Sequence, residues 1–304
     1  LLLDTRAFPV AFWGAIKAGV VPVALNTLLT SEQYAYILGD SRAKALVVSA
    51  QLLPVVQPIL GKLPFLTHLF VSGGEAPPFA LGLEAELAAQ PAAFETVETA
   101  ADETAFWLYS SGSTGMPKGV MWRHVDLFGA LASSGYQALG LPMPTNEAEV
   151  GATARLLNEE GKSPTNLCAP PLMHGVALFL AMSSFVLGGK VVLLKSRKFD
   201  PAELVNLTAR YGVNQISLVG DAFAKPINRY LEELANSGSS TPNLDSVVRI
   251  TSSGATLSGD QKLGLRRFMP NATMIDMLGA SEGGPFGIDL TPRSEERRVG
   301  KECR

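Results

Sequence analysis

The chain has 304 residues, of which 47% are hydrophobic, and this length is enough to fill one large domain or two ordinary ones. Charged residues make up only 17% of the chain, and the formal net charge of −3 provides no basic surface for a nucleic-acid backbone, which excludes nucleic-acid binding. The longest apolar run, residues 176–187, is shorter than the ~20 residues that a membrane span requires, so we expect no transmembrane segment.

The ends of the chain and its cysteines indicate its cellular setting. The chain opens without an initiating Met or a signal peptide, which predicts a fragment of a longer protein. Cys168 and Cys303 are far apart and lack metal-ligand spacing, so we expect a reduced, cytoplasmic protein with no disulfide framework and no metal cage. Seven of the ten residues from 295 to 304 are charged, which predicts a disordered or foreign tail over residues 291–304.

Helical and strand-like segments alternate in the first third of the chain. Residues 8–17 carry apolar side chains at helical spacing, and residues 31–38 have the pattern of a capped helix start. Residues 20–25 and 45–48 are apolar and β-branched, which predicts buried strands, and the alternation continues to residue 71. This alternation is typical of the α/β class.

A stretch rich in glycine and hydroxyl groups, residues 109–120, is the most distinctive part of the sequence. Its glycines allow successive backbone N–H groups to point at an anion, and Lys118 supplies a positive charge, so we interpret it as a phosphate-binding loop. An ordinary surface turn rarely combines these residues in this order. Apolar residues on both sides predict strand, loop, strand, and Pro117 and Gly119 flank the lysine; both features differ from a Walker loop.

The second part of the chain continues the α/β pattern. Residues 124–139 predict a helix that begins at His124, and we expect this histidine to have a structural role at the helix end. Further predicted helices are residues 176–187, 201–211 and 259–268, and the predicted strands are residues 190–194, 213–219, 247–251 and 273–277.

The phosphate-binding loop resembles the signature loop of the adenylate-forming acyl-CoA synthetases, which activate a carboxylic acid with ATP and transfer it to coenzyme A. The resemblance is carried by the run Tyr-Ser-Ser-Gly-Ser-Thr-Gly-Met-Pro-Lys-Gly-Val at residues 109–120. It implies the large N-terminal domain of that family over residues 1–290, an α/β fold with mixed and parallel sheets flanked by helices, without the small C-terminal lid domain. It also implies that ATP phosphates contact Ser110, Ser111, Gly112, Ser113, Thr114, Gly115 and Lys118.

Two segments resemble the part of the family that surrounds the acyl group. Residues 169–175 match a motif whose histidine, here His174, lies where the acyl pocket meets the nucleotide; a structural histidine at a helix start is the alternative. Residues 219–223 end a predicted strand at the edge where open parallel sheets place ligands, and the family builds acyl-pocket wall there. The small residues Gly220 and Ala222 would leave room for a bulky acid.

Residues 252–258 and 278–283 resemble two further motifs, which line the nucleotide site of the family. In the second motif Ser281 keeps the hydroxyl that contacts the α-phosphate, and Glu282 keeps the carboxylate that engages Mg²⁺. Together with His174 these two residues are the predicted catalytic residues. Leu278 replaces the usual tyrosine, so the ring that lies over adenine is missing. The resemblance assigns further nucleotide contacts to Gly254, Ala255, Asp276 and Gly279.

Residues 279–283 also fit the Gly-x-Ser-x-Gly elbow of serine hydrolases. Such an elbow opens into a helix and needs a histidine later in the chain. Here residues 283–285, two glycines and a proline, break helices, and all three histidines lie upstream. A serine hydrolase is therefore kept only as a remote alternative.

The resemblance changes along the chain. Residues up to about 120 are most similar to benzoate–CoA ligases, whereas residues from about 120 to 290 are most similar to bacterial long-chain and steroid-acid acyl-CoA synthetases. We expect a join near residue 120, with an undivided natural protein as the alternative. Because residues 170–256 would build most of the pocket, the expected substrate is a bulky aliphatic or sterol-like acid rather than benzoate.

The sequence thus predicts an AMP-forming acid–CoA ligase that takes ATP, Mg²⁺, coenzyme A and a small-molecule carboxylic acid. The ribose motif and the lid lysine of the family do not occur after Glu282, so we expect impaired turnover. A non-catalytic fragment that binds nucleotide remains an alternative.

Overall fold

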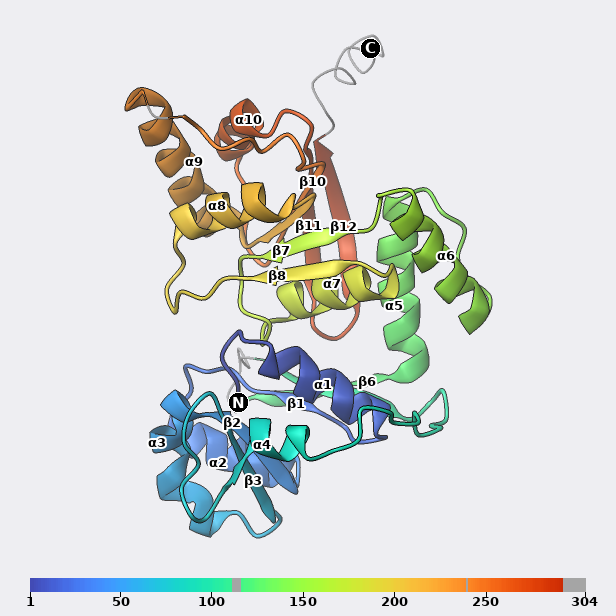
Figure 1. Cartoon of the computed structure of the whole chain (residues 1–304), viewed down its shortest axis with the longest axis vertical. Helices are drawn as coiled ribbons and strands as arrows, with labels where there is room; N and C mark the ends of the chain where they lie inside the picture. The colour runs from blue at the N-terminus through green and yellow to red at the C-terminus, as the bar shows by residue number, and fades with distance from the viewer. Residues whose placement is uncertain (111–115, 239, 292–304) are drawn as a thin grey trace. The chain divides into compact units, whose positions relative to one another are not determined.

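The computed structural model describes residues 1–110, 116–238 and 240–291. The chain divides into two compact units, Leu1–Leu127 and Phe128–Arg304, and helix α5 (His124–Ala138) contains the boundary. Each unit combines helices with sheets and has a hydrophobic core of its own, which confirms the predicted α/β class (Figure 1). None of the described helices is both long enough and apolar enough to cross a membrane.

In the part that the structure describes, the first unit contains two three-stranded sheets. One has the order β2-β3-β4 and is parallel; the other has the order β1-β5-β6, in which β1 is parallel and β6 antiparallel to β5. The strands are β1 (Val23–Ala24), β2 (Ala45–Ser49), β3 (His68–Ser72), β4 (Leu81–Gly82), β5 (Thr104–Ser110) and β6 (Lys118–Arg123). The helices before α5 are α1 (Ala7–Lys17), α2 (Ser31–Asp40), α3 (Leu53–Val56) and α4 (Leu83–Ala88), with 3₁₀ helices at Ala50–Leu52 and Gln57–Lys62.

Helix α2 begins where the sequence predicts it, because its first turn is capped reciprocally. The Thr30 hydroxyl accepts a hydrogen bond from the Gln33 N–H over 3.4 Å, and the Gln33 side chain accepts one from the Thr30 N–H over 3.0 Å. Tyr34 and Ile37, one helical turn apart, are both buried in the core of the first unit. Capping and burial of one face together place the helix.

The buried strand expected over residues 20–25 is mostly wrong. Only Val23–Ala24 pairs with β5, and Val20 and Val21 are 58% and 40% exposed. An apolar run shows that a segment can be buried but does not show which partner covers it.

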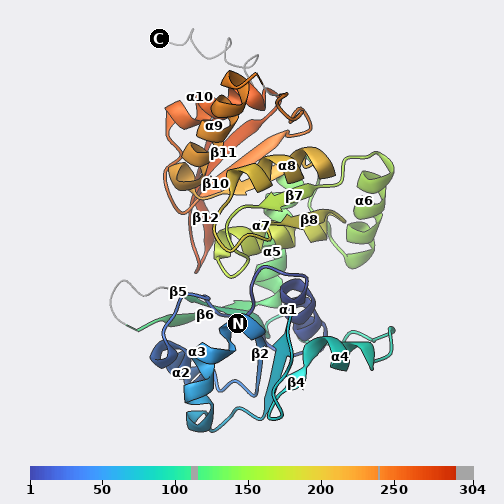
Figure 2. The same ribbon diagram turned by 60° about the vertical axis from the view of Figure 1, so that its left-hand side comes forward.

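The second unit is built on a sheet whose described strands have the order β12-β11-β10-β9-β7-β8. All neighbouring pairs are parallel except β11 and β12, which run antiparallel (Figure 2). The strands are β7 (Thr165–Cys168), β8 (Lys190–Leu193), β9 (Gln215–Leu218), β10 (Arg249–Ser253), β11 (Thr273–Ala280) and β12 (Gly284–Thr291). The helices after α5 are α6 (Glu147–Glu159), α7 (Gly175–Val186), α8 (Pro201–Tyr211), α9 (Gly220–Asn236) and α10 (Gly259–Phe268).

Helices cover both faces of this sheet. Leu167 packs in the large core that α8, α9 and α10 share, whereas the thiol of the next residue, Cys168, lies 3.9 Å from the Ala177 carbonyl of α7. Consecutive strand residues point to opposite faces, so α7 lies on the face opposite to α8, α9 and α10 (Figure 1). Neither α9 nor β12 was predicted, and β11 continues three residues beyond its expected end. The predicted single domain over residues 1–290 stays a prediction, and residues 292–304 of the expected tail lie outside the described residues.

Candidate functional site

The strands on either side of the predicted phosphate-binding loop form an antiparallel pair in the first unit. Ser110 ends β5 and lies opposite Lys118, the first residue of β6, and the Ser110 hydroxyl donates to the Lys118 carbonyl over 3.5 Å. Ser110 is half-buried and Lys118 is exposed. This pairing confirms the strand, loop, strand arrangement and excludes a Walker loop, which leads into a helix. The loop residues Ser111, Gly112, Ser113, Thr114 and Gly115 lie outside the described residues.

Tyr109, next to Ser110, anchors this end of the strand pair. Its hydroxyl donates to the Asp40 carboxylate over 2.6 Å, and burial, followed by this hydrogen bond, raises the pKa of Tyr109 above its ordinary value. A Cβ atom built at Gly119 would lie 3.3 Å from the Tyr109 ring and 3.4 Å from the Trp107 ring, so a glycine at 119 lets the aromatic rings pack on the backbone.

In the second unit, parallel strands bring predicted site residues to one edge of the sheet. Strands β7, β9, β10 and β11 run in the same direction, so their carboxyl ends share the edge at which open α/β sheets bind ligands. The predicted site residues that follow these strands are His174, Gly220, Ala222, Gly254, Ala255, Ser281 and Glu282. A Cβ atom built at Gly254 would lie 3.6 Å from Val219 and 3.9 Å from Val176, so the loop after β10 meets the end of β9 and the start of α7 at this edge.

Hydrogen bonds join the turn after β9 to β10 and to the loop that follows it. The Gly220 N–H donates to the Ser252 hydroxyl over 2.9 Å, and the Asp221 N–H donates to the Thr256 carbonyl over 3.0 Å. Gly220 has a φ of +52°, and a Cβ atom there would lie 2.5 Å from the Thr256 carbonyl oxygen and 2.7 Å from that of Ala255. Close backbone approach, rather than room for an acid, therefore accounts for the glycine at this position.

The acyl-pocket residues expected after β9 open helix α9. Gly220 is its first residue, is buried, and faces the loop after β10, whereas Ala222 is exposed to solvent. The predicted reason for the glycine at 220, room for a bulky acid, is therefore replaced by the close approach of the Thr256 carbonyl. The assignment of both residues to an acyl pocket stays a prediction.

Two carboxylates hold the loop between β10 and α10. Asp221 Oδ1 accepts a hydrogen bond from the Ser258 N–H over 2.8 Å, and this bond is the largest reason why the pKa of Asp221 lies below its ordinary value. Asp276 Oδ2 accepts one from the Leu257 N–H over 3.3 Å, which places this predicted nucleotide contact beside the loop. Sequence reasoning did not single out Asp221, because its partner is 37 positions away and no local motif marks the pair.

His174 precedes α7 as its N-cap residue, and its carbonyl accepts the hydrogen bond of the Leu178 N–H over 2.9 Å. The side chain makes no capping hydrogen bond and remains accessible. Protein atoms around the ring nevertheless lower the pKa of the imidazole below its ordinary value. Because that ordinary value is about 6.5, the ring is neutral at pH 7 and can both donate and accept a hydrogen bond. Its catalytic role stays a prediction.

The turn between β11 and β12, residues 281–283, carries Ser281 and Glu282. It lies beyond Met277, which pairs with the last residue of β10, and the Gly283 N–H donates to the Ala280 carbonyl over 3.4 Å. Glu282 is exposed, Gly279 is exposed, and Leu278 is 72% exposed. The chain then enters strand β12 and not a helix, which removes the geometry of a serine-hydrolase elbow.

Glu282 is the magnesium ligand that the sequence predicts at this turn, and this assignment stays a prediction. Among the described residues, no group of three or more His, Cys, Asp or Glu side chains could hold a metal ion. Mg²⁺ is usually bound through one or two carboxylates together with phosphate oxygens and water. The accessible carboxylate of Glu282 meets that requirement only when phosphate supplies the other ligands.

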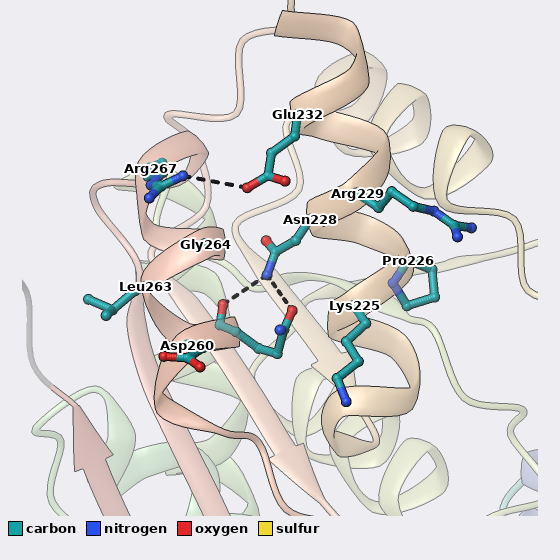
Figure 3. A pocket seen from close by; sticks show the side chains of 10 residues that line it. Lys225, Pro226, Asn228, Arg229, Glu232, Asp260, Leu263, Gly264 and Arg267 are labelled. Carbon is teal, nitrogen blue, oxygen red and sulfur yellow. Dashed lines mark hydrogen bonds and ion pairs between the residues drawn. The ribbon is translucent and has the colours of Figure 1, made fainter. Parts of the chain in front are cut away.

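A groove of about 600 Å³ lies between α9 and α10, and its described lining contains none of the predicted site residues (Figure 3). The charged side chains that line it are Lys225, Arg229 and Arg267 together with Glu232 and Asp260. Arg267 lies 3.5 Å from Glu232, and the buried Asn228 amide donates to the Gln261 carbonyl and side chain over 3.0 and 2.8 Å. The groove therefore carries charges of both signs.

Comparison with known proteins agrees with the motifs. The profile of the family described as AMP-binding enzyme matches residues 1–303. The benzoate–CoA ligase of Thauera aromatica is 52% identical over 126 residues, 41% of this chain and 23% of that protein. The medium-chain acyl-CoA ligase Mig of Mycobacterium avium is 31% identical over 284 residues, 91% of this chain and 49% of that protein.

Solved structures show the same fold. The crystal structure of the anthranilate CoA ligase AuaEII in complex with anthranoyl-AMP is similar with a TM-score of 0.80 at 23% sequence identity, over 95% of this chain and 51% of that chain. The chain therefore spans about half the length of the proteins that it matches along most of its own length.

Proposed function

The chain belongs to the AMP-binding enzyme family, and from that membership we propose that it binds ATP and a carboxylic acid and forms an acyl adenylate, which then passes its acyl group to coenzyme A. The observation that carries the proposal is the family match over residues 1–303. The names of the two curated relatives, a benzoate–CoA ligase and a medium-chain acyl-CoA ligase, support acid–thiol ligation as the reaction.

We assign the phosphates of ATP to the loop between β5 and β6. Lys118 is exposed at the start of β6 and supplies the cation, and Ser110 lies opposite to it at the end of β5. A lysine held at the base of a glycine-rich loop can contact the β- and γ-phosphates while backbone N–H groups contact the same anion. The assignment of residues 111–115 rests on the sequence alone.

We assign the nucleoside end to the carboxyl edge of the second unit. Gly254 and Ala255 are exposed there, and the next residue, Thr256, accepts a hydrogen bond from the Asp221 N–H in the turn after β9. Gly279 is exposed at the end of β11, and the side chain of Leu278 is exposed where the family has an aromatic ring. An aliphatic side chain stacks less well on a base than a ring does, so we expect modest ATP affinity.

We assign the reacting groups to the second unit as well, which carries His174, Ser281 and Glu282. The Ser281 hydroxyl would donate to an oxygen of the α-phosphate, and the neutral His174 ring would orient the acid. Glu282 would hold Mg²⁺, which, when bound, neutralises negative charge on the phosphates.

For the acid we propose a bulky aliphatic or sterol-like carboxylate. The medium-chain ligase matches 91% of the chain, whereas the benzoate–CoA ligase matches 41%. The test is competition between benzoate and a long-chain carboxylate for the purified chain loaded with ATP. Tighter binding of benzoate would contradict the proposal.

Calorimetry with ATP tests the function itself. A charge-assisted hydrogen bond contributes ~1.5–3 kcal/mol, so Lys118→Ala should weaken ATP binding by about tenfold to a hundredfold. Lys62→Ala removes a different exposed lysine of the first unit and serves as the control. We expect its affinity for ATP to be unchanged. Equal ATP affinity in all three proteins would contradict the phosphate assignment. Carboxylate-dependent exchange of pyrophosphate into ATP then separates adenylate formation from the alternative, nucleotide binding without catalysis.

A further inference from the structure

The loop between β10 and α10, residues 254–258, begins with the exposed residues Gly254 and Ala255, which we assign to the nucleotide. We propose that Asp221 is a positioning residue for this site: its carboxylate and its backbone N–H together fix the 254–258 loop from behind. The proposal rests on the proposed function, because it takes Gly254 and Ala255 as the ligand-binding surface. Asp221 itself contacts the loop and not the ligand.

Asp221 holds the loop through two hydrogen bonds, one donated by its backbone and one accepted by its side chain; we call this pair the clamp. Its backbone N–H donates to the Thr256 carbonyl over 3.0 Å, and its side-chain Oδ1 accepts from the Ser258 N–H over 2.8 Å. The two partners lie on either side of Leu257, whose side chain is buried in the core of the second unit. A segment held at two points around a buried side chain can neither slide nor rotate.

Gly220, the residue before Asp221, allows the turn after β9 to approach the 254–258 loop closely. Gly220 has a left-handed backbone, and its Cα approaches the loop so closely that a Cβ atom would be 2.5 Å from the Thr256 carbonyl oxygen. Its N–H is bound to the Ser252 hydroxyl, within β10. The turn after β9 therefore contacts β10 and the loop after it at successive residues.

An acidic residue at the start of a helix usually caps that helix, and Asp200, which does so, can be compared directly with Asp221. Asp200 Oδ1 accepts from the Ala202 N–H over 2.9 Å and caps its own helix, α8. The Asp221 side chain instead reaches a residue 37 positions later, at the start of another helix. Its second oxygen lies 3.4 Å from Lys225, whose side chain is 64% exposed, so that ion pair contributes little to holding the loop.

The experiment compares Asp221→Ala, Asp221→Asn and Asp200→Ala in the purified chain. Hydrogen exchange of the Leu257 and Ser258 amides reports on the clamp without any ligand, and calorimetry with ATP reports on the site. We expect Asp221→Ala to speed exchange at both amides by about tenfold or more and to weaken ATP binding by about three- to tenfold, in proportion to one charge-assisted hydrogen bond that acts indirectly.

The two other variants separate positioning from stability. Asparagine keeps the oxygen that accepts from Ser258, so Asp221→Asn should restore most of the protection and most of the affinity. Asp200→Ala likewise loses a carboxylate that accepts one backbone hydrogen bond and should lower the melting temperature about as much as Asp221→Ala, but it should leave loop exchange and ATP affinity unchanged.

The outcomes distinguish this proposal from the proposed function. Unchanged exchange of Leu257 and Ser258 in Asp221→Ala overturns the clamp, whatever the chain binds. Faster exchange with unchanged ATP affinity overturns the role of the clamp in the nucleotide site. If the wild-type chain does not bind ATP at all, the proposed function fails, and the exchange data alone still decide whether Asp221 holds the loop.

Discussion

Two turns of the second unit carry predicted nucleotide contacts, and they are held in different ways. The 254–258 loop donates hydrogen bonds to the carboxylates of Asp221 and Asp276, and its Leu257 side chain is buried. The turn at residues 281–283 ends a ribbon in which Leu278 is 72% exposed and Glu282 is exposed. Hydrogen bonds to other elements therefore position the 254–258 loop in the free chain, whereas Glu282 in the second turn is exposed to solvent.

The largest effect should come from disturbing the turn behind the 254–258 loop. Gly220→Ala adds a Cβ atom 2.5 Å from a backbone oxygen at a φ of +52°, and we expect it to lower the free energy of unfolding by about 3–4 kcal/mol. Gly212 has nearly the same backbone, φ +57°, but nothing within 4 Å of a built Cβ. Gly212→Ala should therefore cost only about 1–2 kcal/mol. Urea denaturation of the two variants measures the difference, and equal losses would contradict the close approach.

A smaller effect, here a gain in ATP affinity, is expected at Leu278 in the pair of strands β11 and β12. Leu278→Tyr restores a ring beside the proposed nucleotide site, and because stacking on a base contributes ~1–3 kcal/mol, ATP affinity should rise by about tenfold. The side chain is exposed, so the free energy of unfolding should change by less than about 0.5 kcal/mol. Calorimetry and urea denaturation of one preparation give both values. A loss of stability without a gain in affinity would place this side chain in a packing role.

Glu282 should affect binding only when Mg²⁺ is present. Glu282→Gln removes the charge from an exposed turn, and we expect about tenfold weaker binding of Mg-ATP and no change for ATP in excess chelator. Asp260→Asn, at an exposed carboxylate that lines the groove between α9 and α10, is the control and should affect neither. A loss of the same size with and without the metal would remove Glu282 from the metal site.

The smallest effect is the acid dependence of the 254–258 loop. The pKa of Asp221 is lowered in the folded chain, so its contribution to stability is present above the unfolded value of about 3.9 and is lost as the pH falls through the lowered folded value. About a quarter of the side chain is exposed, 26%, and this exposure limits the contribution to less than about 1 kcal/mol. Denaturation between pH 6 and pH 3 should show a shallower loss of stability in Asp221→Asn than in the wild type. If stability falls equally with pH in both proteins, protonation of Asp221 does not weaken its contact with the loop.

Local signals in the sequence predicted the elements that are decided locally. Helix α10 has the predicted bounds, Gly259–Phe268, and α8 is capped by Asp200 and begins at Pro201 as its sequence indicates. The strands on either side of the phosphate-binding loop follow from apolar, β-branched flanks that only a strand pair accommodates.

Contacts between distant residues could not be predicted in this way. Gly220 was interpreted as a small residue in a pocket, because the Thr256 carbonyl that lies against it belongs to a distant segment, and no local pattern marks Asp221 as the partner of Ser258. Helix α9 was missed because Pro226 lies inside it, and a proline normally marks the end of a helix. Strand β12 was missed because it begins with a glycine and a proline, Gly284 and Pro285, and its place was decided by pairing with β11.

Hydrogen exchange of the wild-type chain with and without Mg-ATP tests the difference between the two turns most directly. We expect the Leu257 and Ser258 amides to be protected already in the free chain and to change little on binding, whereas the Glu282 amide should exchange quickly in the free chain and slow down when Mg-ATP is added. Fast exchange at Leu257 and Ser258 in the free chain, or unchanged exchange at Glu282 in the saturated complex, would contradict this expectation.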